Sequence, residues 1–187
     1  MATDVETSPD RRTCFGYDEA VGAGAIAGLI GGTVMALAAM IRAAIIGAGF
    51  WLPMQNVAAV WYGVGAYLAD GGSVFVGLVT HLAISAGWGA LYGVFVDRET
   101  SIGASMGMGL LYGASVWLLM TYIALPLFNS TMAARVEIQP FWFWFGIHLL
   151  FGGTIGILTP AFARARAGEE APERAGPGRD RPEEQPV

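Results

Sequence analysis

The stretch from Val74 to Val96 constrains the fold more than any other part of the chain. It is 23 residues long and contains no formally charged side chain. A helix of that length, rising about 1.5 Å per residue, can cross the roughly 30 Å hydrocarbon core of a bilayer. This stretch therefore predicts a transmembrane helix.

Three other apolar segments also have the length of a membrane span, and they cover residues 20–46, 101–125 and 141–163. The 187 residues of the chain are 55% hydrophobic and only 13% charged. A soluble domain usually has about 25% charged residues. The predicted fold is an all-α integral membrane protein with four transmembrane helices.

The segment between the first two spans is too polar and too short to cross the membrane. Pro53 can open a helix there. Apolar residues then recur at helical spacing, namely Val57, Val60, Trp61, Val64 and Leu68. We expect a helix at about 54–69 that lies in the outer membrane interface or re-enters the membrane.

The two termini are polar. Residues 1–18 are predicted to be a disordered arm, residues 19–164 the transmembrane domain, and residues 165–187 a disordered tail. Four spans place both termini on one side of the membrane. Arginines on that side (Arg11, Arg12, Arg98, Arg164, Arg166) outnumber those on the other (Arg42, Arg135). The positive-inside rule then predicts cytoplasmic termini in a bacterial-type inner (plasma) membrane.

The chain resembles two copies of one two-helix hairpin. The segments that contain His81 and His148 align without a gap, and Gly89 then matches Gly156. The first and third spans also align, with Gly28 matching Gly109. Because each copy has two spans, the copies would run parallel to each other and be related by an axis along the membrane normal.

Small residues spaced four apart predict close contacts between helices. Such steps let two helix backbones approach, usually for packing alone. The predicted packing positions are Gly24, Gly28, Gly32, Gly89, Gly93, Gly109, Gly113, Gly152 and Gly156.

His81 and His148 are the main candidates for function, because ionisable side chains inside a membrane are rare and often functional. The repeat places both at one depth, about 10 Å below the outer surface. Two facing imidazoles can bind a metal, in particular the iron of a b-type haem. Arg42 or Arg135 would then contact the haem propionates.

Two other interpretations of the histidines stay open. Each histidine can form a hydrogen bond to a neighbouring helix, through a hydroxyl group such as that of Ser85, Thr80, Thr121 or Thr154. Alternatively, the pair can relay protons or bind a transported ion.

Several function classes are disfavoured. The chain has no basic stripe of the kind that binds nucleic acid. Cys14 is its only cysteine, so neither an internal disulfide nor a thiolate metal cluster can form. Ser85 lies four residues from His81, but no third orienting acid accompanies them. We therefore predict no catalytic residues and no enzymatic activity.

In its size, glycine-rich spans and histidine-containing span, the chain is similar to the small four-helix inner-membrane proteins of bacteria of the YagU type. The resemblance covers roughly residues 20–163 and implies no activity. We expect a non-enzymatic accessory or scaffold subunit of a larger membrane complex, or a homo-oligomer. The alternative is an electron, ion or proton carrier that uses His81 and His148.

Overall fold

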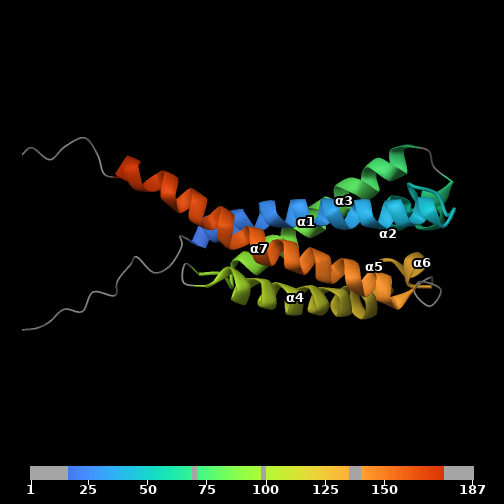
Figure 1. Cartoon of the computed structure of the whole chain (residues 1–187). Helices are drawn as coiled ribbons and strands as arrows, with labels where there is room; N and C mark the ends of the chain where they lie inside the picture. The colour runs from blue at the N-terminus through green and yellow to red at the C-terminus, as the bar shows by residue number, and fades with distance from the viewer. Residues whose placement is uncertain (1–16, 69–70, 98–99, 135–139, 175–187) are drawn as a thin grey trace, which may run out of the picture.

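The computed structural model describes residues 17–68, 71–97, 100–134 and 140–174. Within these ranges the chain forms helices and no β-strand. Four helical segments are long and apolar enough to cross a membrane, which confirms the predicted all-α fold with four spans. The four run lengthwise through the molecule, and the start of the first lies at the same end as the end of the last (Figure 1).

The four spans are built from six helical elements. The first, second and fourth spans are α1 (Tyr17–Ile45), α3 (Gly71–Gly93) and α7 (Phe141–Arg174). The third span consists of α4 (Ile102–Leu119), a π-helical turn η2 (Met120–Ala124) and α5 (Leu125–Phe128). The hydroxyl of Ser101 caps α4 by accepting a hydrogen bond from the backbone N–H of Ala104 at 3.1 Å.

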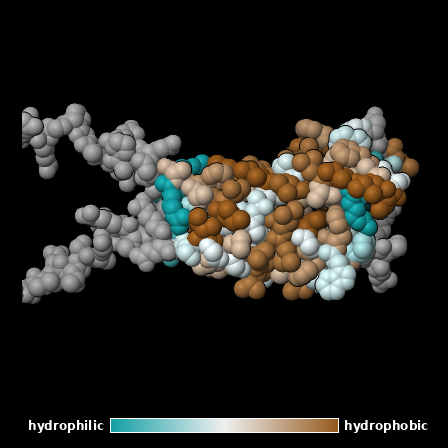
Figure 2. All heavy atoms as spheres, in the orientation of Figure 1, coloured by the Kyte–Doolittle hydropathy of each residue, from teal (hydrophilic) through white to brown (hydrophobic). Residues whose placement is uncertain are grey.

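The two ends of the bundle differ in character. The end at which α1 starts and α7 leaves the bundle is called here the terminal end. The opposite end, the aromatic end, has exposed rings at Trp51, Trp61, Phe128 and Trp142. Figure 2 shows hydrophobic residues across the middle of the visible face and hydrophilic residues mainly near the two ends. This distribution suits a protein that spans a bilayer.

Pro126 does not end the third span, and the prediction of a stop at Leu125 was wrong. Proline lacks a backbone N–H and its ring clashes with the carbonyl one turn earlier in an α-helix. Here the wider π-helical turn η2 comes directly before Leu125, and the helix then continues to Phe128. The π turn changes the local hydrogen-bonding pattern, so the chain passes the proline without leaving the helical path.

The helix expected at 54–69 is shorter than predicted. The α-helical part, α2 (Leu52–Tyr62), is followed by a 3-10 turn, η1 (Gly63–Tyr67). The α-helix ends there because Gly63 has a φ of 54°, outside the helical region. One face of α2 packs on α3, where the backbone of Met54 lies against Gly77. Its position relative to the membrane surface stays a prediction.

The predicted terminal boundaries also need correction. Helix α1 starts at Tyr17, two residues before the predicted start of the membrane domain. Helix α7 continues to Arg174, so the prediction of disorder was wrong for residues 165–174. Ala, Glu and Arg are strong helix formers, and they extend α7 beyond its apolar part. Residues 1–16 and 175–187 lie outside the described residues.

Helices α1 and α7 occupy the centre of the bundle. Helix α1 packs between α3 and α7, and α7 packs in turn on α4. At the terminal end, Ala20, Ala23 and Ala27 of α1 are almost fully buried together with Phe151 and Ile155 of α7. Side chains this small let α1 approach both neighbours closely.

Helices α3 and α4 have few backbone contacts, and two tyrosines form hydrogen bonds between them. The hydroxyl of Tyr92 donates to the backbone carbonyl of Ser105 at 2.6 Å, and that of Tyr112 donates to the carbonyl of Trp88 at 2.8 Å. The two tyrosine rings also meet edge to face, 5.3 Å between centroids. These contacts close the terminal half of the bundle between α3 and α4.

Candidate functional site

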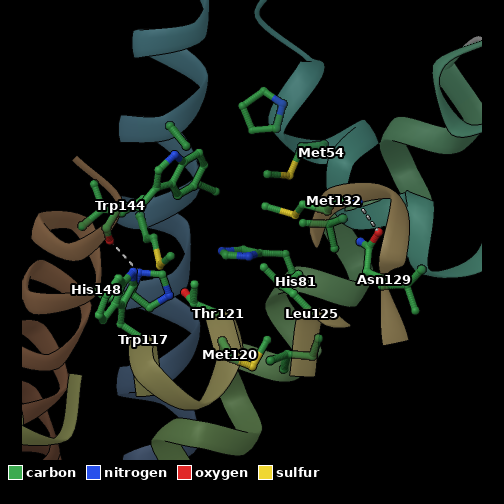
Figure 3. Close-up of a pocket in the computed structure, with 18 of the residues that line it drawn as sticks. Met54, His81, Trp117, Met120, Thr121, Leu125, Asn129, Met132, Trp144 and His148 are labelled. Atoms are coloured by element: carbon green, nitrogen blue, oxygen red, sulfur yellow. Dashed lines mark hydrogen bonds between the residues drawn. The ribbon is translucent and has the colours of Figure 1, made fainter. Parts of the chain in front are cut away.

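The aromatic half of the bundle contains a cavity of about 470 Å³. Side chains from α1, α2, α3, α4, the π turn, α5, α6 (Ser130–Ala133) and α7 line it. Both histidines, which are 67 positions apart in the chain, reach this one cavity (Figure 3). The structure therefore brings together the two residues that the sequence singled out.

His81 is held by a hydrogen bond to another helix. Its Nε2 lies 2.9 Å from the backbone carbonyl oxygen of Gly32 on α1. A carbonyl oxygen can only accept a hydrogen bond, so a neutral His81 must carry its proton on Nε2. The other ring nitrogen, Nδ1, is then a hydrogen-bond acceptor.

His148 is held by a hydrogen bond within its own helix. Its Nδ1 lies 2.7 Å from the backbone carbonyl oxygen of Trp144, one turn earlier in α7. By the same argument, a neutral His148 carries its proton on Nδ1 and has an acceptor lone pair on Nε2. The two rings are thus fixed in opposite tautomers, and each keeps one nitrogen free to accept.

The expected hydroxyl partners of the histidines have other roles in the structure. Thr80 accepts a hydrogen bond from the indole of Trp61 at 2.9 Å, and Thr154 donates to the carbonyl of Leu150 at 2.8 Å. Ser85 faces Gly32 on α1, and Thr121 lines the cavity. Hydrogen bonding of the histidines is therefore observed, but through backbone carbonyls.

Four methionines line the cavity beside the histidines, and sequence analysis missed them. They are Met35 of α1, Met54 of α2, Met120 of the π turn and Met132 of α6. The described residues that line the cavity include no Asp, Glu, Lys or Arg. The methionines follow no regular spacing in the sequence, so only the tertiary structure reveals that they converge.

Two buried asparagines fix one wall of the cavity. The side-chain amide of Asn129 donates to the backbone carbonyl of Asn56 on α2 at 2.9 Å, and its oxygen accepts from the backbone N–H of Met132 at 2.9 Å. The hydroxyl of Tyr67 donates to the side-chain oxygen of Asn56 at 2.8 Å. This network holds α2 against α6. In the sequence, Asn56 comes directly before one apolar segment and Asn129 directly after another. A polar amide at the end of an apolar segment was the signal that could have indicated this network.

The predicted packing glycines meet in two places. Each place is called here a seam, a line along which two helix backbones are in direct contact. In the first seam, Gly24 and Gly28 of α1 face Gly89 and Gly93 of α3, where an added Cβ would collide with the opposite backbone. The second seam joins Gly109 and Gly113 of α4 to Gly152 and Gly156 of α7 in the same way. Gly32 lies one turn beyond the first seam, against Ser85 and the ring of His81.

Of the two arginines proposed to bind haem propionates, only Arg42 is among the described residues, and it is not one of the residues that line the cavity. The guanidinium carbon of Arg42 lies 4.8 Å from the centroid of the Phe143 ring, which is a cation–π contact between α1 and α7. Arg135 lies outside the described residues. Arg42 therefore has an aromatic partner in the structure.

Comparisons of the chain with protein-family models, with curated proteins and with solved structures found no match.

Proposed function

We propose that this chain is a non-enzymatic membrane protein that holds a small ligand or ion between His81 and His148. The observation that carries this proposal is the single cavity that both histidines line. Its volume of about 470 Å³ lies within the usual range of ligand pockets, roughly 300–1,000 Å³. A mostly apolar lining with a few convergent polar groups is also typical of such pockets.

Binding without catalysis suits the cavity lining best. Hydrolysis or group transfer needs a nucleophile, a base and an orienting group within hydrogen-bonding reach. Ser85, the one serine near His81 in the sequence, faces Gly32 and is not among the described residues that line the cavity. The hydroxyl of Thr121 does line the cavity, but the described lining residues include no carboxylate that could orient a histidine beside it as a base.

Native mass spectrometry of the protein, extracted from membranes in mild detergent, tests the proposal. We expect a bound molecule or ion that is lost when both histidines are replaced, in His81→Phe/His148→Phe. Ser115→Ala is the control, because Ser115 is exposed on α4 and bonds only within its helix. A bound species that survives the double substitution, or no bound species at all, would contradict the proposal.

A b-type haem ligated by both imidazoles fits the cavity poorly. The outer ring nitrogen of His81, Nε2, already bonds the carbonyl of Gly32, so ligation through it requires that bond to break. Arg42, one of the expected propionate partners, packs on Phe143. We expect no Soret band from the purified protein. A band lost in both His81→Ala and His148→Ala would restore this candidate.

An accessory role in a larger membrane complex is a second candidate, and the aromatic end favours it. Trp142, Phe128 and Trp61 are 78%, 70% and 64% exposed there. Clustered exposed aromatic residues anchor a helix at the membrane interface, and they also suit contact with a partner subunit. A partner that co-purifies in stoichiometric amount, and is lost on Trp142→Ala/Phe128→Ala, would support this role. A monomer with no partner would argue against it.

We infer that the terminal end faces the cytoplasm of a bacterial-type inner membrane. Arg164 and Arg166 support this orientation, because they lie at the terminal end, where Arg164 donates to the carbonyl of Thr100 and Arg166 lies against Gly22. Reporter fusions after Asp97 and after Ser130 test it. Cytoplasmic reporter activity at Ser130 would reverse the proposed orientation.

We further infer that the two hairpins arose as copies of one unit. Equivalent glycines in the two alignments contact equivalent partners, which supports the duplication. Gly28 faces the Cα of Gly89, and its counterpart Gly109 faces the Cα of Gly156. A shared ancestor would explain why both histidines line one cavity. An alignment of relatives in which one hairpin aligns to the other no better than to unrelated spans would remove this inference.

A further inference from the structure

The cavity presents two nitrogen lone pairs to whatever occupies it. Nδ1 of His81 and Nε2 of His148 are acceptors, because the other nitrogen of each ring donates to a backbone carbonyl. A ligand held by both must therefore supply either two hydrogen-bond donors or one cation. Both kinds of ligand remain compatible with the histidines alone, so the rest of the lining decides between them.

Thioether groups dominate the rest of the donor set. The cavity is lined by four of the chain's eight methionines, and each comes from a different helical element. With the two histidines, six elements each supply one donor that suits a soft metal. Figure 3 shows the side chains of Met54 and Met132 extending into the cavity above His81, with His148 on the α7 side.

The charge of the lining selects among metal ions. Among the described residues that line the cavity there is no carboxylate and no thiolate, so every donor is neutral. Hard cations such as Mg²⁺ and Ca²⁺ need carboxylate or carbonyl oxygens, and structural Zn²⁺ sites usually use thiolates or carboxylates beside histidine. Thioether and imidazole donors suit copper(I), whose single charge is also the least costly to bury.

The backbone around Met120 is unusual in a way that fits a binding site. Met120 begins the π-helical turn η2, and Thr121 follows it at the cavity wall. Single π turns within α-helices are frequent at functional sites, because they redirect side chains relative to the regular helix. The π turn thus contributes both a thioether and the local change in helix geometry.

We propose that the cavity binds one copper(I) ion through His81, His148 and the thioethers of Met54 and Met132. This proposal rests on the proposed function of the cavity and names its ligand. Nδ1 of His81 and Nε2 of His148 are the nitrogen donors. Met35 and Met120 add two more thioethers to the lining.

Competition for copper(I) tests the proposal. The full-length protein in detergent is titrated with copper(I) under ascorbate, against the chromophoric chelator bicinchoninate, with silver(I) as a redox-inert substitute. We expect one ion per chain and no binding of Zn²⁺ at the same site. Met54→Leu/Met132→Leu should weaken binding roughly tenfold or more, and so should His148→Phe.

A matched pair of methionines controls for changes unrelated to the cavity. Met106 and Met108 of α4 are 40% and 37% exposed and do not line the cavity. Met106→Leu/Met108→Leu should leave copper affinity unchanged. Leucine nearly conserves the volume of methionine, so both double variants should fold, and a thermal melt checks this.

The outcomes separate this proposal from the one on which it rests. Copper binding that is absent, or that is equally strong in Met54→Leu/Met132→Leu, overturns the copper site. If native mass spectrometry then finds an organic ligand that needs the histidines, such as an aromatic diol, the cavity keeps its binding role without copper. If it finds nothing, both proposals fall.

Discussion

The first hairpin, α1 with α3, and the second hairpin, α4 with α7, each contain a glycine seam. The two hairpins differ at the next helical turn toward the histidines. In the first hairpin, the side chain of Ser85 lies against Gly32, and the ring of His81 also reaches Gly32. In the second, the matching positions are Gly152 and Gly113, and Gly113 lies against the backbone of His148 itself.

One side chain explains this difference. Ser85 occupies space between α1 and α3, and the imidazole beyond it can reach across to the carbonyl of Gly32. Gly152 has no side chain, so α4 and α7 stay in backbone contact for another turn. His148 then bonds the carbonyl of Trp144 in its own helix. Equivalent positions in a repeat therefore need not make equivalent hydrogen bonds.

The largest expected effect comes from filling either seam. In Gly89→Leu or Gly156→Leu, the new Cβ would collide with backbone atoms of the opposite helix, so the helices must separate. We expect each substitution to cost about 3 kcal/mol or more of unfolding free energy, or to abolish the folded monomer. Unfolding in mixed detergent micelles, followed by circular dichroism, measures this.

Two glycines outside the seams are the controls for this experiment. A Cβ added at Gly87 in α3, or at Gly146 in α7, meets nothing within 4 Å. Gly87→Leu and Gly146→Leu should therefore be neutral or slightly stabilising, since leucine favours helix more than glycine does. Equal losses in seam and control variants would show that the seams do not hold the hairpins together.

Exchanging the residues at 85 and 152 should come next in size. In Gly152→Ser the added side chain meets the backbone at Gly109 and Gly113, which should cost about 1–3 kcal/mol. In Ser85→Gly the spacer beside Gly32 is lost, and we expect His81 to lose its cross-helix bond. Nitrogen-15 NMR of the imidazoles reports this as a changed tautomer population. An unchanged His81 spectrum would mean that Ser85 is not the spacer.

Removing each imidazole in the ligand-free protein should have a smaller, unequal effect. His81→Phe removes a bond between two helices and should cost about 0.5–1 kcal/mol. His148→Phe removes only a bond within α7 and should cost less. Micelle unfolding of both variants, beside Ser115→Ala, tests the order. A larger loss of unfolding free energy from His148→Phe than from His81→Phe would contradict the expectation that the bond between helices contributes more than the bond within α7.

The smallest expected effect concerns one contact between the hairpins, that of Arg42 with Phe143. Arg42→Gln removes the cation above Phe143 and should cost about 0.5 kcal/mol. Arg42→Lys keeps a cation there and should recover most of the loss. Thermal unfolding of the two variants is the measurement. Equal stability of both variants with the original chain would show that the contact contributes nothing.

The number of spans could be predicted because long uncharged segments have few alternatives to a membrane helix. The histidines could be singled out for the same reason, as rare ionisable groups within such segments. Their tautomers could not be predicted, because these depend on which backbone carbonyl each ring meets. The course of the chain past Pro126 was also missed, because a π turn has no clear sequence pattern.

The residues that line the cavity come from early and late parts of the chain, so the cavity cannot form until its late residues have been synthesised. Met35, Met54 and His81 belong to the first hairpin and its connecting helix, whereas Trp144 and His148 belong to α7, which is synthesised after them. The first seam can form while translation continues, because all of its glycines lie before residue 94. The cavity is complete only after α7 has inserted, because α7 supplies His148. A chain truncated before α7 would therefore carry three spans and a cavity without its α7 wall.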